Sequence, residues 1–287
     1  MSKIPISDKT LGKGNHQGKS NPFNITNEET KISKALLEEA EIDLALYDEL
    51  EKVKFTEDLK LGVERRKIFL LQQAEEKAVK STLPSFVRMA ALPLLAMGVF
   101  FDEPPISIRR VIEIYKKRTI EHLEKAFDRK KLGHSLSRNF DFNRLFEDFL
   151  VVLTLIYQTD PDLLDYVNES VEITKSKDIN RVLKEQDVSK LTGSIEEMIK
   201  KLEKFNTEGY TEETAVFATR EFFAFTAISI NITARNIGIL NILEGYEQSS
   251  RYPDQIIISE NDPIFKQKEQ IRNCIAEFIK VNQKNIK

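Results

Sequence analysis

From Asn27 almost to its end, the chain carries amphipathic helical repeats that few glycines or prolines interrupt. Its 287 residues include only 10 glycines and 9 prolines, and this scarcity favours helices over strands joined by turns. Hydrophobic residues at 41% and charged residues at 31% are typical of a folded globular chain. We therefore expect an all-α fold: a compact multi-helix body of roughly ten helices, with a candidate lobe boundary near 132–138.

The first 27 residues differ from the rest, because they contain glycines, prolines and scattered lysines but no amphipathic repeat. We expect residues 1–27 to form a flexible polar arm, disordered in an isolated monomer and ordered against a partner. Residues 12–20 superficially resemble a phosphate-binding loop. The glycine spacing is wrong for that motif, however, and no strand precedes it, so a flexible arm is the better interpretation.

Helix-start signals and apolar spacings divide the rest of the chain, after the N-terminal arm, into predicted helices. Thr26 and Glu29 have the spacing of a capping box, which predicts a first helix starting at 26 or 27. Apolar periodicity then predicts helices over about 56–80, 83–101, 107–131, 139–157, from 161 onward, within 178–205 (one or two helices), and over 211–243, either as one helix or as two with a break near Gly238. Residues 28–247 are accordingly the predicted helical body.

Residues 248–287 are predicted to be a loop followed by a C-terminal docking helix. The helix carries an apolar face formed by Phe265, Ile271, Ile275, Phe278 and Ile279. The loop before it is long enough for the helix to dock either on its own body or on a neighbouring subunit.

Two apolar stretches, Leu83–Phe101 and Phe222–Leu243, were considered as membrane spans. Arg88 and two prolines interrupt the first, and Arg235 lies inside the second, where a charge is costly in lipid. Both are therefore predicted to be buried helices, with no membrane span. The N-terminus lacks the apolar region of a secretory signal, and the single Cys274 fits a reducing compartment. We expect a cytoplasmic protein, or one within an assembled particle.

Basic residues gather between 107 and 144, where eleven lysines and arginines stand against five acidic residues, a local excess of +6. Such clustering is what binding to a phosphate backbone requires. The candidate nucleic-acid-binding residues are Arg65, Arg66, Lys67, Arg109, Arg110, Lys116, Lys117, Arg129, Lys130 and Lys131. Two alternatives stay open: docking on an acidic protein surface, or a solvated helix face with Glu113–Lys117 and Glu121–Lys125 pairs.

An acidic face on the first helix offers a partner for the basic region. Residues 38–51 contain seven acidic residues and no lysine or arginine. If the acidic and basic patches face different directions, they produce head-to-tail contacts between copies, and such contacts form rings or filaments.

The sequence gives little indication of a catalytic site. None of the three histidines follows a glutamate at the three-residue spacing of a helical di-iron site, and Cys274 lies on the apolar side of its helix. We therefore expect no catalytic residue, no metal and no cofactor. The leading prediction is a non-enzymatic, self-associating structural protein of coat or nucleocapsid type that forms a homo-oligomer through its terminal arms. In its sharper form it binds single-stranded nucleic acid such as RNA along the basic region. The alternatives are a monomeric protein-binding adaptor or scaffold and a helical membrane-active protein.

Overall fold

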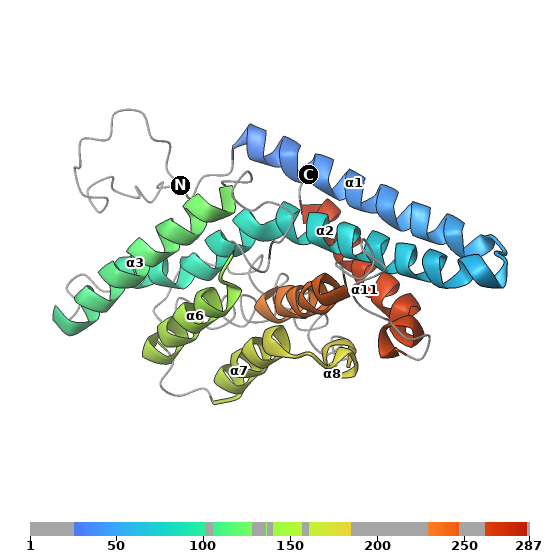
Figure 1. The fold of residues 1–287 in the computed structure, drawn as a ribbon. Helices are drawn as coiled ribbons and strands as arrows, with labels where there is room; N and C mark the ends of the chain where they lie inside the picture. The colour runs from blue at the N-terminus through green and yellow to red at the C-terminus, as the bar shows by residue number, and fades with distance from the viewer. Residues whose placement is uncertain are drawn as a thin grey trace, which may run out of the picture.

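The computed structural model describes residues 26–100, 106–127, 136, 140–156, 161–184, 229–246 and 262–285. They form the helices α1 (Asn27–Lys52), α2 (Glu57–Phe100), α3 (Ile106–Phe127), α6 (Phe142–Ile156), α7 (Pro161–Lys175), α8 (Ile179–Leu183) and α11 (Pro263–Asn285), together with a helical segment at 229–246 (Figure 1). Over these ranges there is no strand, which confirms the predicted all-α fold. The described part of the chain contains eight helices, against the roughly ten predicted.

The helix α2 is the spine of the molecule. Its 44 residues correspond to about 66 Å at 1.5 Å per residue, and α1, α3, α6 and α11 all pack against it. The sequence predicted two helices here, over 56–80 and 83–101. That division was wrong, because the helix continues through both internal prolines.

Packing explains why α2 continues through Pro84. A proline inside a helix removes one N–H donor and costs about 3 kcal/mol. Around it, the side chains of Leu83, Phe86 and Val87 are buried, and each such burial stabilises the fold by about 1.5–3 kcal/mol. The hydroxyl of Ser81 also donates to a carbonyl oxygen one turn earlier, at 2.6 Å. The apolar contacts on both sides therefore outweigh the local cost of the proline.

The helices α1 and α2 form an antiparallel hairpin. The predicted capping box is confirmed: the Glu29 N–H donates to Thr26 Oγ1 at 3.2 Å, and the Thr26 N–H donates to Glu29 Oε2 at 2.8 Å. The guanidinium of Arg88 donates to the same Glu29 carboxylate at 2.9 Å. Farther along the pair, Lys77 Nζ lies 2.7 Å from Asp43 Oδ2. These contacts fix the register of the hairpin.

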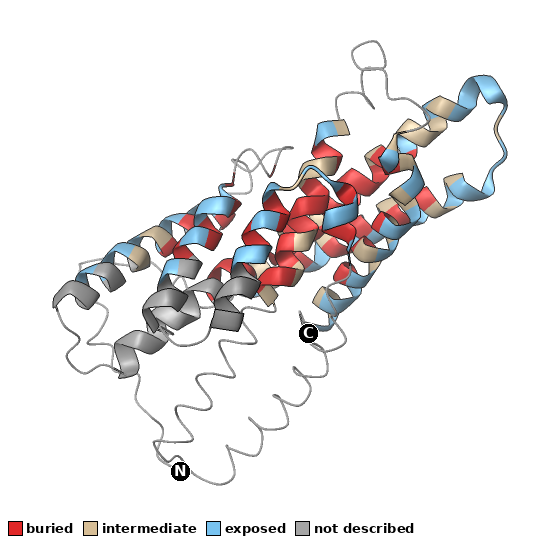
Figure 2. Ribbon diagram, turned by 90° about the horizontal axis from the view of Figure 1, so that it is seen from below, coloured by how far each residue is buried: buried red, intermediate tan, exposed pale blue. Residues whose placement is uncertain are grey.

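The helix α3 follows the far end of α2 and packs back against it, and α6 packs on both (Figure 1). The rings of Phe86 in α2 and Phe146 in α6 lie 5.6 Å apart, centroid to centroid. Figure 2 shows the buried residues in red along the inner sides of the helices, whereas exposed residues in pale blue cover the turn between α1 and α2.

The C-terminal helix α11 packs against α1, α2 and α8 of the same chain. Ile271, Ile275, Phe278 and Ile279 are buried, and Phe265 packs partly against the core. These are the side chains whose spacing predicted a docking face. The helix therefore contributes its apolar face to the same core as the α1–α2 hairpin.

The segment 229–246 is one helix through Gly238, so the break considered there does not occur. A Cβ atom at this position would lie 2.9 Å from the carbonyl oxygen of Ile173 and 3.1 Å from a methyl group of Val182. The glycine thus permits a close approach to α7 and α8 and does not end a helix. The side-chain amide of Asn231 donates to the Ser170 hydroxyl at 2.9 Å across the same contact.

No helix among the described residues is long and apolar enough to cross a lipid bilayer. Several other predictions concern residues outside the described ranges. They are the arm over 1–25, most of the lobe boundary at 132–138, the helices over 185–205, the first part of the helix over 211–243 and the loop residues 247–261. These stay predictions.

Candidate interaction surface

The structure separates the two predicted basic clusters. Residues 65–67 lie near the start of α2, whereas α3 follows the opposite end of α2. Side chains are described for five of the candidates: Arg66, Arg110 and Lys117 are exposed, Arg65 is half-buried and Lys67 is buried. Arg109 and Lys116 are placed only as backbone of α3, and Arg129, Lys130 and Lys131 lie outside the described residues. The described candidates therefore do not form one continuous basic surface.

Lys67 is only 5% exposed and belongs to a four-residue ionic cluster that we call the Lys–Glu clasp. Its ammonium lies 2.8 Å from Glu64 and 3.1 Å from Glu51. The ammonium of Lys268 in α11 lies 2.6 Å from Glu64 and 2.9 Å from Glu51. The clasp thus joins the end of α1, the start of α2 and α11. It also turns the charge of Lys67 inward, away from any external phosphate.

The clasp pairs two ammonium groups with two carboxylates. Burial alone raises the pKa values of Glu51 and Glu64, but hydrogen bonds and charge from Lys268 and Lys67 outweigh it and hold both values below their ordinary range. Burial lowers the pKa of Lys268, but its two carboxylate partners more than compensate and raise it. Glu51, Glu64 and Lys268 therefore stay ionised at neutral pH, and the clasp connects the three helices.

The acidic face predicted at 38–51 is smaller in the structure than in the sequence, because part of it is used inside the molecule. Asp43 pairs with a lysine of α2, Asp48 with an arginine of α11, and Glu51 belongs to the clasp. Glu38 and Glu41 are exposed, as is Glu49, which pairs with the equally exposed Lys52. These three exposed glutamates form the acidic edge of α1.

This edge accompanies a row of exposed apolar side chains. Ile42 is 58% exposed, Leu46 50% and Val53 53%. Ile42 and Leu46 are one helical turn apart on the same side of α1, whereas Val53 lies just beyond the end of the helix, where the backbone is extended. Leu59, at the start of α2, is 57% exposed at the same end of the hairpin. We call Glu38, Ile42, Leu46 and Glu49 the outer face of α1.

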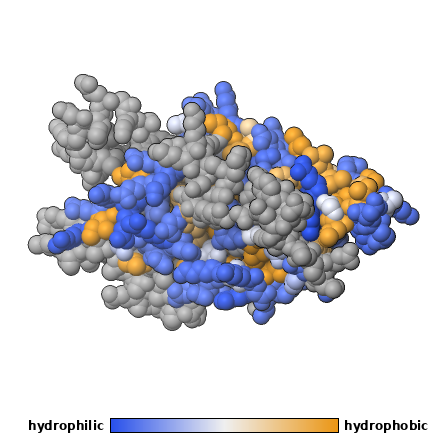
Figure 3. Space-filling view, viewed as in Figure 1, coloured by the Kyte–Doolittle hydropathy of each residue, from blue (hydrophilic) through white to orange (hydrophobic). Residues whose placement is uncertain are grey.

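Figure 3 shows hydrophobic atoms in orange along α1 and toward its turn into α2. Isolated exposed apolar residues are ordinary, whereas a continuous apolar stripe with a polar edge is typical of a protein-binding surface. Sequence reasoning missed this stripe. The available signal was a pair of apolar residues at 42 and 46, four residues apart within the first predicted helix.

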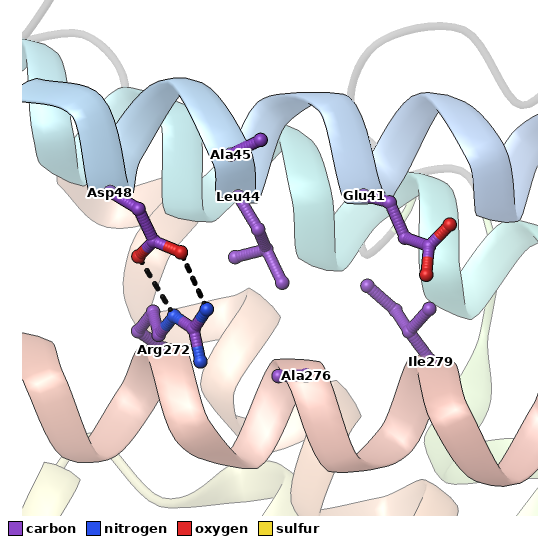
Figure 4. A pocket seen from close by; sticks show the side chains of 7 residues that line it. All are labelled: Glu41, Leu44, Ala45, Asp48, Arg272, Ala276 and Ile279. Carbon is purple, nitrogen blue, oxygen red and sulfur yellow. Dashed lines mark hydrogen bonds and ion pairs between the residues drawn. The ribbon is translucent and has the colours of Figure 1, made fainter.

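A shallow groove adjoins the outer face of α1, between α1 and α11 (Figure 4). It encloses about 240 Å³ and is lined by Glu41, Leu44, Ala45, Asp48, Arg272, Ala276 and Ile279. Ligand pockets for small organic molecules usually measure about 300–1,000 Å³. The groove is therefore better suited to receiving side chains from another protein than to enclosing a ligand.

A second polar cluster joins α3 to α6. Arg118 Nη1 lies 2.7 Å from Asp148 Oδ1, and His122 Nε2 lies 3.6 Å from Asp148 Oδ2. Burial lowers the pKa of His122, Asp148 opposes this effect, and two nearby basic side chains lower the value further. His122 is buried, and its ring packs against Phe140 with centroids 5.8 Å apart.

Glu75 is the most isolated buried charge-bearing group in the described residues. Its side chain is fully buried in the middle of α2, and neither carboxylate oxygen has a hydrogen-bond partner. Burial raises its pKa well above the ordinary value, which favours the neutral acid. A buried polar group without a partner destabilises a fold, so Glu75 is a cost that the packing around it must offset.

The polar clusters therefore fall into two kinds. The clasp and the Arg118–Asp148 pair connect helices of one chain, whereas the outer face of α1 is directed at solvent. Over the described ranges, no three histidine, cysteine or acidic side chains converge as metal ligands would. No protein-family model matches this chain, and comparisons with curated proteins and with solved structures return no match either.

Proposed function

We propose that this protein is a non-enzymatic, self-associating assembly protein and that the outer face of α1 forms its contact with another copy. The observation that carries the proposal is the pair Ile42 and Leu46, each at least half exposed and one turn apart on α1, with the exposed Val53 just beyond the end of the helix. Full burial of a side chain of this size contributes about 1.5–3 kcal/mol, so covering the exposed half of each one contributes roughly 1 kcal/mol. The hydrophobic effect therefore favours an arrangement in which a second protein surface covers these side chains.

The charges beside the line restrict what can cover it. Glu38, Glu41 and Glu49 are exposed along the same helix. A phosphate backbone or an anionic membrane would be repelled by these carboxylates. The partner of this face is therefore a protein surface with apolar and basic character. A monomeric adaptor would use the same face for a different protein, so the oligomeric state separates the two functions.

The membrane-active alternative has less support from the packing. It requires that one of the apolar stretches leave the core, yet Leu83 and Phe86 in the first are buried. In the second, Ile230, Ile237 and Leu240 are buried as well. Exposing either stretch would disrupt the packing of several helices at once.

The test is light scattering of the full chain during size-exclusion chromatography, over a range of loading concentrations. The wild-type chain is expected to increase in mass with concentration. A variant carrying Ile42→Ser and Leu46→Ser is expected to remain monomeric. Val281→Ser is the matched control, because Val281 is 48% exposed on α11 but lies on another surface, and it should associate like the wild type.

Circular dichroism and thermal melting establish that each variant is folded, which is expected because the changed side chains are already exposed. A wild-type chain that stays monomeric at every concentration would contradict self-association and favour the adaptor. Association that is equal in all three chains would show that the outer face of α1 is not the contact.

A further inference from the structure

We infer that the outer face of α1 binds the N-terminal half of α3 on a second copy, in a head-to-tail contact. The inference rests on the proposed self-association and names the two surfaces that meet. It is carried by three observations: a matching arrangement of side chains, the absence of internal partners for the basic residues, and the location of the two surfaces at different ends of the molecule.

The two helices present the same pattern with opposite charge. On α1, the exposed Ile42 has Glu38 one turn before it and Glu49 two turns after it. On α3, Ile114 is 45% exposed, with Arg110 one turn before it and Lys117 one turn after it. In each helix these positions lie on one face, because residues three, four or seven apart are neighbours on a helix surface. Two exposed apolar side chains on α1, flanked by Glu38 and by Glu49 with its partner Lys52, thus complement a single exposed apolar side chain on α3 that is flanked by Arg110 and Lys117.

Two basic side chains of α3, Arg110 and Lys117, are exposed and have no ion-pair partner among the described side chains, unlike Arg118, which pairs with Asp148. A solvated surface was expected to pair Glu113 with Lys117 and Glu121 with Lys125. These four side chains are described and exposed, and neither pair approaches within ion-pair distance. Arg110 likewise has no carboxylate partner among the described side chains.

Among the described exposed side chains of α3, basic residues outnumber acidic ones only in the first half, because the second half carries Lys125 beside two exposed glutamates. In the first half, Glu113 is an exposed acidic residue beside Arg110 and Lys117, whereas Glu121 and Glu124 are exposed in the second half. A partner with an acidic edge is therefore expected to contact the first half, centred on Ile114. Charges at the edge of such a contact mainly guide encounter and select the partner.

The positions of the two surfaces require a second molecule. The outer face of α1 lies toward the turn that precedes α2, whereas the first half of α3 follows the end of α2 (Figure 1). The intervening helix is about 66 Å long. Since different surfaces of the two copies meet, the contact repeats from copy to copy and produces a ring or an open filament.

The experiment uses two charge-reversed full-length chains. The first carries Glu38→Lys and Glu49→Lys on α1, and the second carries Arg110→Glu and Lys117→Glu on α3. Each alone should associate at least about tenfold more weakly than the wild type, because like charges then meet across the contact. Mixing the two chains should restore association, since each reversed surface then finds an opposite charge. Glu269→Lys with Glu277→Lys, two exposed changes on α11, is the control and should have no effect.

The outcomes separate this inference from the proposed function. If the α3-reversed chain associates like the wild type while the Ile42 and Leu46 variant does not, self-association stands and the α3 contact is wrong. If the wild-type chain never associates, the proposed function itself fails. If the charge reversal on α3 abolishes binding to a labelled RNA oligomer but leaves self-association intact, α3 binds nucleic acid and the inference is overturned.

Discussion

The guanidinium of Arg272 donates two hydrogen bonds to the carboxylate of Asp48, from Nε to Oδ1 at 3.0 Å and from Nη2 to Oδ2 at 2.6 Å. The pair joins α11 to α1 beside the groove of Figure 4. Two parallel bonds to one carboxylate fix the orientation of both side chains, which a lysine would not do. The C-terminal helix is therefore held by directed polar contacts as well as by its apolar face.

We expect Asp48→Ala to lower the free energy of unfolding modestly, by about 1 kcal/mol, because the pair is partly exposed to solvent. A double-mutant cycle with Arg272→Ala should give a coupling energy of about 0.5–1 kcal/mol from urea denaturation. Additive effects of the two changes would show that the pair contributes no stability of its own.

Glu75 predicts an unusual dependence of stability on pH. Its folded pKa is raised above the ordinary value of 4.5, so the unfolded chain loses this proton first as pH rises. Below pH 4.5 the ionisation of Glu75 does not reduce the free energy of unfolding. As pH increases from 4.5 toward the folded pKa, the free energy of unfolding falls. Glu75→Gln removes the ionisation, so its stability relative to the wild type should increase with pH, by at most about 1.4 kcal/mol per pH unit.

The measurement is urea denaturation of both chains at several pH values from below the ordinary glutamate pKa to neutrality. Glu277→Gln, at an exposed position, is the control for removing a charge. Stability curves that stay parallel for Glu75→Gln and the wild type would contradict the assignment of a raised pKa to Glu75.

Gly238 and Gly62 form a matched pair of helical glycines. Gly238→Ala places a methyl group 2.9 Å from the Ile173 carbonyl oxygen, and we expect it to destabilise the fold by about 1–3 kcal/mol. Nothing lies within 4 Å of a Cβ atom at Gly62, so Gly62→Ala should stabilise α2 by about 0.5–1 kcal/mol through helix propensity. Thermal melting of both variants tests the pair, and shifts in the same direction would contradict the close approach at Gly238.

The sequence-based prediction that the basic region binds nucleic acid gives its own expectation for Arg110 and Lys117. If these residues contact phosphates, changing both to glutamate should weaken binding to all RNA sequences alike, because backbone contacts carry no sequence information. Affinity of the wild type should fall with salt, with a logarithmic slope of about −0.7 per contacted phosphate. Fluorescence anisotropy with a labelled oligomer measures both effects. No affinity at low salt would remove nucleic acid from the account.

Local signals in the sequence predicted the ends and faces of several helices. Thr26 and Glu29 identified the start of α1, because a capping box depends only on residues close in sequence. The apolar spacing of Ile271, Ile275 and Phe278 likewise identified the buried face of α11. What these predictions share is that the interaction or the period lies within one helix.

Features that depend on contacts between distant residues could not be read in the same way. The continuity of α2 through Pro84 depends on burial by other helices. The acidic face was overestimated because Asp48 meets an arginine more than two hundred residues later in the chain. For the same reason Lys67 was assigned to a binding surface, although Glu51 and Glu64 hold its charge inside the fold.

The central claim, that the outer face of α1 contacts another copy, is tested most directly by a photo-crosslinking amino acid at Leu46 of the full chain. The same group at Glu269, exposed on α11, is the control. Irradiation is expected to give covalent dimers from position 46 and few from position 269, with crosslinked peptides that map to the first half of α3. Equal yields from the two positions would contradict the claim. So would the absence of an intermolecular product from position 46 at concentrations at which light scattering shows association.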